Sequence, residues 1–115
     1  MTKNKTEQTA LVFYGKDLAG RICKDPEGPG SGFEFEYDPA YLQKPGAKPI
    51  SLGLPLQKEK YRSKKLFPFF EGLLPEGWLL ELTSQTLNID PDDEFELLLH
   101  TGTDTVGAVT VRPEN

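Results

Sequence analysis

The sequence predicts an α+β domain in which a small antiparallel β-sheet carries two to three helices on one face. The first half of the chain alternates apolar and polar residues and is divided by Gly- and Pro-rich turns, as is typical of antiparallel strands. The second half spaces its apolar residues three and four apart and surrounds them with capping residues, as is typical of helices. A short apolar run near the C-terminus adds a closing strand.

Three strands are expected in the first half. Residues 10–14 are β-branched and aromatic, residues 15–17 form a turn, and residues 18–23 return as the second strand. Residues 25–32 hold three Gly and two Pro, which predicts a loop. Residues 33–38 read FEFEYD, so a strand there has one apolar and one solvated face. Residues 39–61 lack clear periodicity and are expected to follow the surface irregularly, with a short strand at 50–54.

The second half begins with a helix predicted from near Pro75, because Pro suits the first helical position and Glu76 complements the helix dipole. Its apolar positions recur at helical spacing and are predicted to face the core. This stripe comprises Leu79, Leu82, Thr83, Thr86 and Leu87.

A second helix is predicted from Asp90, the N-cap, with Pro91 in the first position and Gly102 just past the end. Its predicted inner face consists of Phe95, Leu98 and Leu99. Residues 107–111 are expected to form the closing strand. The chain therefore divides into a disordered N-terminal tail, residues 1–9, and one domain, residues 10–113.

Composition restricts the function classes. A formal net charge of -5 argues against direct binding to nucleic acid or to an anionic membrane surface, which needs a basic patch. The polar N-terminus lacks the apolar segment of a signal peptide, which favours a cytoplasmic protein. The single cysteine, Cys23, excludes an intramolecular disulfide.

Catalytic motifs are missing from the sequence. His100 is the only histidine and is expected near a helix end, where a cation complements the dipole. The acidic segment 90–94 lacks the glycine of a calcium loop, and the glycines at 28–32 precede a strand, whereas phosphate-binding loops precede a helix. The sequence thus predicts a protein-binding module that is not an enzyme and has no catalytic, metal or cofactor site.

Two segments, FPFFEGLLPEGW and DDEFELLLHTGTDTVGAVTV, closely resemble the small N-terminal subdomain of HipA-type serine/threonine kinases. The residues that carry the resemblance are Phe69, Phe70, Glu71, Leu73, Leu74, Pro75, Glu76 and Gly77, then Phe95, Leu97, Leu98, Gly102, Asp104, Gly107 and Ala108. Residues 33–42 and 50–56 resemble the sheet of that subdomain, so the resemblance extends over residues 10–113.

A free-standing version of this subdomain is similar to the HipS-type antitoxins of three-part HipBST modules. The resemblance implies a cytoplasmic bacterial antitoxin that binds and neutralises a separately encoded HipT-like serine/threonine kinase. A HipB-like helix-turn-helix protein is implied as a third component. Two alternatives stay open: an activating or folding subunit that completes a split HipA-type kinase, or a general peptide-binding adapter or piece of a larger kinase.

The residues expected to contact the partner lie around the start of the first predicted helix. They are Trp78, Glu76, Gly77, Pro75, Leu74 and Glu81. Trp78 falls off the predicted buried stripe, so it is expected to anchor the interface; the alternative is that it folds back over Phe69 or Phe70 as part of the core.

Overall fold

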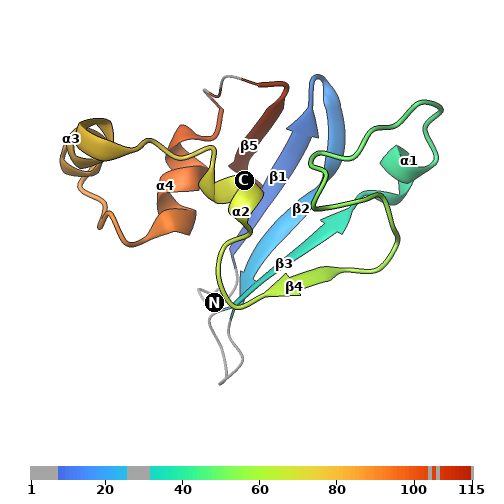
Figure 1. The fold of residues 1–115 in the computed structure, drawn as a ribbon, viewed down its shortest axis with the longest axis horizontal. Coiled ribbons are helices and arrows are strands. Elements are labelled where there is room, and N and C mark those ends of the chain that lie inside the picture. The colour runs from blue at the N-terminus through green and yellow to red at the C-terminus, as the bar shows by residue number, and fades with distance from the viewer. Residues whose placement is uncertain (1–7, 26–31, 104, 106, 115) are drawn as a thin grey trace.

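The computed structural model describes residues 8–25, 32–103, 105 and 107–114 (Figure 1). The first seven residues of the predicted N-terminal tail and residues 26–31 of the predicted loop lie outside the described residues. The α+β prediction is confirmed, because the described residues form one antiparallel sheet and several helices.

The sheet has five strands in the order β4-β3-β2-β1-β5, and each neighbouring pair is antiparallel. The strands are β1 (Gln8–Tyr14), β2 (Asp17–Asp25), β3 (Gly32–Tyr37), β4 (Tyr61–Ser63) and β5 (Val109–Pro113). The first three strands pair in chain order, β1 with β2 and β2 with β3, as the turns predicted between them imply. The last strand returns to pair with β1, which places the C-terminal segment at one edge of the sheet.

Alternation along the strands separates the buried from the exposed face. In β3, Phe35 and Tyr37 are buried and Glu36 is exposed, as the sequence predicts. Phe35 is paired with Ile22 of β2, and its ring contacts the ring of Phe70, with 5.8 Å between the centroids. The core therefore lies between this face of the sheet and the segments that cross it.

The described helices are α1 (Pro39–Leu42), α2 (Pro68–Glu71), α3 (Gly77–Leu87) and α4 (Glu94–Thr101). Helix α2 contributes the fully buried Phe70, and α4 contributes Phe95, Leu97 and Leu98. Helix α4 packs on β5 and ends at Gly102, where an added Cβ would lie 2.6 Å from the carbonyl oxygens of Leu98 and Val111. Only glycine allows the backbone this close approach.

The hydroxyl of Tyr37 fixes the long segment between α1 and β4 to the sheet. It accepts a hydrogen bond from the Ile50 amide at 3.0 Å and donates one to the Leu54 carbonyl. Burial raises the pKa of Tyr37 to about 12. Residues 50–54 are a turn closed by one bridge between Ser51 and Leu54, so the short strand predicted there is wrong.

Both predicted helix starts are also wrong. Glu76 is extended and Gly77 has a φ of 59°, so the chain changes direction there and α3 begins at Gly77 instead of Pro75. The Asp90 side chain accepts a hydrogen bond from the Asp92 amide in a turn, and Asp93 caps α4 instead. Asp90, the predicted cap of the second helix, thus stabilises a turn ahead of α4.

Candidate protein-binding site

Helix α3 stands apart from the sheet. Figure 1 shows it at one end of the molecule, with α4 between it and β5. It packs less extensively on the other described elements than α4 does on β5. It ends at Asn88, whose left-handed conformation lets the Ile89 amide donate to the Ser84 carbonyl at 2.9 Å. Helix α3 is therefore a well-terminated helix on the outside of the domain.

The apolar side of α3 does not face the core, so the prediction of a buried stripe is wrong. Leu79, Leu82 and Leu87 are 46%, 50% and 40% exposed, and we name these three the leucine face. The buried residue of α3 is Ser84, which lies about 140° around the helix from Leu79 at about 100° per residue.

A groove of about 500 Å³ adjoins the leucine face. Its apolar wall consists of Leu73, Leu74 and Pro75, from the segment between α2 and α3, together with Leu79. The opposite wall comes from the end of α4 and the segment before β5 and consists of His100, Thr101, Thr105 and Gly107. Since Leu79 belongs to both features, the groove and the leucine face form one continuous surface.

The predicted contact residues occupy this same region. Leu74 and Pro75 line the groove and are partly buried, whereas Glu76, Gly77 and Glu81 are exposed. Trp78 is the second residue of α3, one helical turn before Leu82, and its side chain lies outside the described part of the structure. The structure thus places Leu74 and Pro75 in the groove, whereas Glu81 lies about 160° around α3 from Leu79 at about 100° per residue. The contact role of all six residues stays a prediction.

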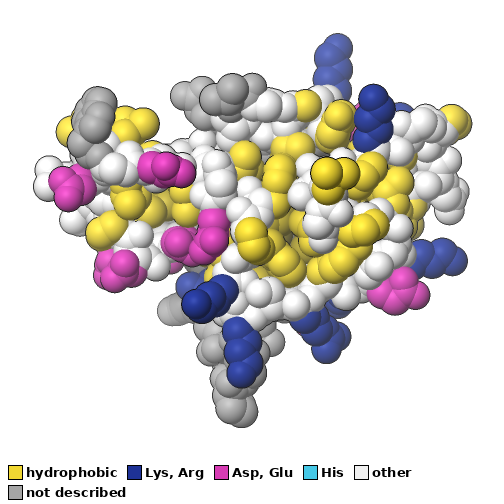
Figure 2. All heavy atoms as spheres, in the orientation of Figure 1, with side chains coloured by type: hydrophobic (Ala, Val, Ile, Leu, Met, Phe, Trp, Pro, Cys, Tyr) yellow, Lys and Arg dark blue, Asp and Glu magenta, His cyan; other side chains and the backbone are white. Residues whose placement is uncertain are grey.

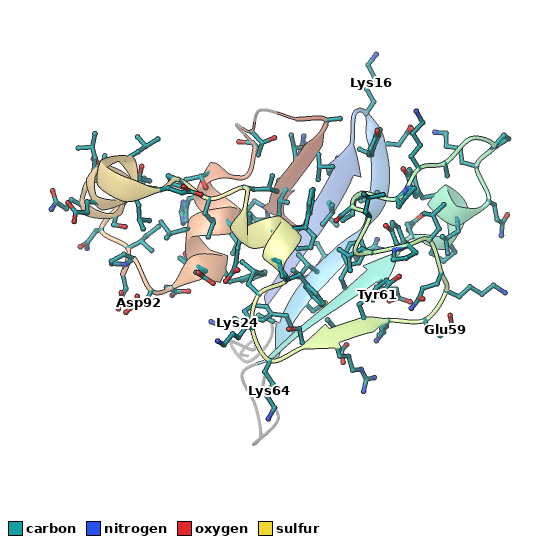
Figure 3. The ribbon with its side chains drawn as sticks, viewed as in Figure 1. Lys16, Lys24, Glu59, Tyr61, Lys64 and Asp92 are labelled. Carbon is teal, nitrogen blue, oxygen red and sulfur yellow. The ribbon has the colours of Figure 1, made fainter. Side chains whose placement is uncertain are left out.

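Charge is distributed unevenly between the two ends of the molecule. Residues 66–111 contain nine Asp and Glu and no Lys or Arg, and twelve of the thirteen basic residues precede residue 66. Figure 2 shows acidic side chains gathered over the end that carries α3 and α4, and most basic ones around the sheet. In Figure 3, Asp92 lies on the α3–α4 loop, while Lys16 and Lys64 project from opposite ends of the sheet.

A second, acidic hollow of about 550 Å³ lies between α2 and α4. Burial raises the pKa of Glu94 there, and the neighbouring Glu71 carboxylate, which shares a hydrogen bond with Glu94, raises it further. Lys65 acts in the opposite direction. Within the described ranges, no group of three or more His, Cys, Asp or Glu side chains is arranged to hold a metal ion.

The position of His100 in the last turn of α4 is as predicted, and its Nε2 lies 3.1 Å from a carboxylate oxygen of Glu96. This pair spans one helical turn on an exposed surface. The described helices are all too short or too polar to span a bilayer.

Sequence reasoning missed the leucine face. Its signal was hidden because leucines at helical spacing predict a buried stripe as readily as an exposed one. The absence of basic residues from 66 to 111 is visible in the sequence and marks the same end of the molecule.

Comparison with known sequence families gives one match that covers most of the chain. Residues 10–112 match the family described as the HipA N-terminal domain. This range contains all five strands and four helices of the described structure except the ends of β1 and β5.

Individual relatives fall into two length classes. An uncharacterized protein of Haemophilus influenzae is 39% identical over 107 residues, which cover 93% of each chain. Two Sinorhizobium fredii proteins, named "Putative kinase Y4mE" and "Putative kinase Y4dM", are 33% and 34% identical over 96% and 69% of this chain. The match covers only 26% and 21% of their own lengths.

Proposed function

Because this chain belongs to the HipA N-terminal domain family, we propose that it is an antitoxin that binds and neutralises a separately encoded HipT-like serine/threonine kinase. One observation carries the proposal. The same domain makes up most of a relative of similar length and about a quarter of a relative named as a kinase. A domain that occurs both as most of a short chain and as part of a longer chain named as a kinase is suited to act on a kinase by contact.

The proposed contact region is the segment of Leu74, Pro75, Glu76, Gly77, Trp78 and Glu81. The left-handed Gly77 sets the direction in which α3 leaves the domain, and the exposed Glu76 and Glu81 are available to basic groups of a kinase that handles phosphate. Trp78 is proposed as the anchor, since Trp is enriched among residues whose truncation weakens binding most.

In this proposal the chain has no catalytic activity, cofactor or metal of its own. It works in the cytoplasm and reaches DNA only through a HipB-like helix-turn-helix protein in a ternary complex. The formal net charge of -5 supports the expectation that the isolated chain contacts neither nucleic acid nor membrane.

Co-expression with a HipT-like kinase, sought first in the neighbouring reading frame, tests the proposal. We expect the chain to restore growth and to reduce kinase autophosphorylation in vitro. Trp78→Ala is expected to weaken binding at least about tenfold, which corresponds to roughly 1.4 kcal/mol. Leu52→Ala is the control, because Leu52 is 96% exposed on the sheet side of the molecule. Binding that leaves toxicity and kinase activity unchanged would contradict the antitoxin role.

A second candidate function is an activating or folding subunit that completes a split kinase. The two relatives named as kinases favour it, because they carry the matching domain within a much longer chain. Both functions require a complex, so the sign of the effect separates them: the subunit increases kinase activity, and the antitoxin decreases it.

A further inference from the structure

We infer that the leucine face and the adjoining groove dock onto a kinase surface that is apolar at its centre and bordered by Lys and Arg. This inference rests on the proposed function, because it specifies the chemistry of the partner surface. It adds the exposed leucines of α3 to the segment that the sequence predicts as the contact.

The apolar part of the inference comes from exposure. A surface helix normally turns its apolar stripe towards the core, but the three leucines of α3 are 40% to 50% exposed. Leu79 extends the patch into the groove beside Leu73 and Leu74. An apolar surface of this kind, next to an exposed acid such as Glu76, which follows Pro75 of the groove, is typical of a protein interface.

The basic border comes from charge complementarity. Every ionised residue between 66 and 111 is acidic at neutral pH, with His100 neutral. A partner that covers α3 therefore meets the exposed acids Glu76 and Glu81 on that helix and the residue before it, and no Lys or Arg from residues 66–111. Lys and Arg around the partner's own patch attract them and speed association, whereas an anionic surface such as nucleic acid is repelled.

The same charges argue for a kinase and against a second copy of this chain. Pairing two leucine faces brings together two α3 helices, each of which carries the exposed acid Glu81 and no Lys or Arg. In the relative named as kinase Y4mE, by contrast, about three quarters of the chain lies outside the matching domain and is available to cover this face.

The experiment measures binding of the full chain to the HipT-like kinase by biolayer interferometry at about 50 mM and 500 mM NaCl. The double variant Leu79→Ser/Leu82→Ser is expected to weaken affinity at least about thirtyfold at both salt concentrations. For the wild type, the association rate is expected to fall at least about fivefold at the higher salt concentration. Glu81→Lys should lower the association rate at low salt.

Two matched controls lie on the sheet side. Leu52→Ser makes the same change at a leucine that is 96% exposed, and Glu59→Lys reverses an exposed charge before β4. Both should bind like the wild type. Circular dichroism should show the native fold for every variant, since the substituted side chains are exposed.

The outcomes separate the inference from the proposed function. If the wild type neutralises the kinase and the leucine variant binds equally well, the docking surface is wrong and the antitoxin role stands. If the wild type does not bind the kinase, the proposed function fails. Sedimentation of the chain alone then decides the occupant: a dimer that Leu79→Ser/Leu82→Ser abolishes assigns the face to a second copy, and a monomer overturns the docking surface too.

Discussion

Two leucines that cross the sheet are buried, whereas two leucines of α3 are exposed. Leu54 and Leu66, on the segments that cross the sheet, are 5% and 2% exposed, but Leu79 and Leu82 are 46% and 50% exposed. The buried core cluster contains Phe35 and Phe70 and, among the described side chains, no residue of α3. Residues of one type therefore stabilise the fold at one end of the molecule and remain available for binding at the other.

Charge follows the same division. Basic residues surround the sheet, where several form ion pairs, such as Lys44 with Asp17 at 2.6 Å and Arg62 with Glu34 at 3.1 Å. Residues 66–111, which include the leucine face, contain only acidic charges, and among the described residues Lys24 of the sheet lies 3.9 Å from Asp93. Like charge beside an apolar patch discourages self-association.

The largest effect should come from Phe35→Ala in the sheet region. Phe35 is fully buried and contacts three other aromatic rings, so its loss leaves a cavity and should cost about 3–5 kcal/mol of unfolding free energy. Leu82→Ala should cost less than about 1 kcal/mol, because its side chain is half exposed. Urea denaturation measures both. Equal losses would mean that α3 is part of the core and that Leu82 stabilises the fold as a buried residue does.

A middle effect is expected from Tyr37→Phe. The change removes a hydroxyl that serves the Ile50 amide and the Leu54 carbonyl, and leaves both buried groups without that partner. We expect a loss of about 1–3 kcal/mol and faster hydrogen exchange of the Ile50 amide. Tyr41→Phe is the matched control, since its hydroxyl bonds to Lys48 at a less buried site, and it should cost less. An unchanged Ile50 exchange rate would show that other contacts hold this segment.

The sheet could be predicted from the sequence because its signals are local. Strict alternation in β3 and the short turn between β1 and β2 each specify a strand without reference to the rest of the chain. The single-turn helices α1 and α2 and the three-residue β4 were missed, because segments this short show no periodicity. Their positions depend on tertiary contacts such as that of Phe70 with Phe35.

The candidate site was predicted in part. The Pro-Glu-Gly turn could be predicted, because Gly77 has the positive φ that such a turn often requires, and its role in binding stays a prediction. The orientation of α3 could not be predicted, since helical spacing identifies an apolar stripe but not what covers it. Whether Leu82 is buried depends on how much space α4 leaves above the sheet, and only the packing of the whole chain decides that.

The smallest effect is expected from Glu94→Gln, in the acidic hollow between α2 and α4. Burial and the Glu71 carboxylate raise the pKa of Glu94, so the folded state holds this proton more tightly than the unfolded state does. The contribution of Glu94 to stability is therefore fully present below its ordinary pKa of 4.5 and is lost as the pH rises through the raised value. Glutamine imitates the protonated form, so the variant should melt about 1–3 °C above the wild type at pH 7.5 and level with it near pH 4.5.

Glu71→Gln removes the neighbouring charge and should reduce the same pH dependence. A variant that melts below the wild type at pH 7.5 would show that ionised Glu94 stabilises the fold, for example through Lys65. Repulsion between the Glu94 and Glu71 carboxylates would then not destabilise the folded state.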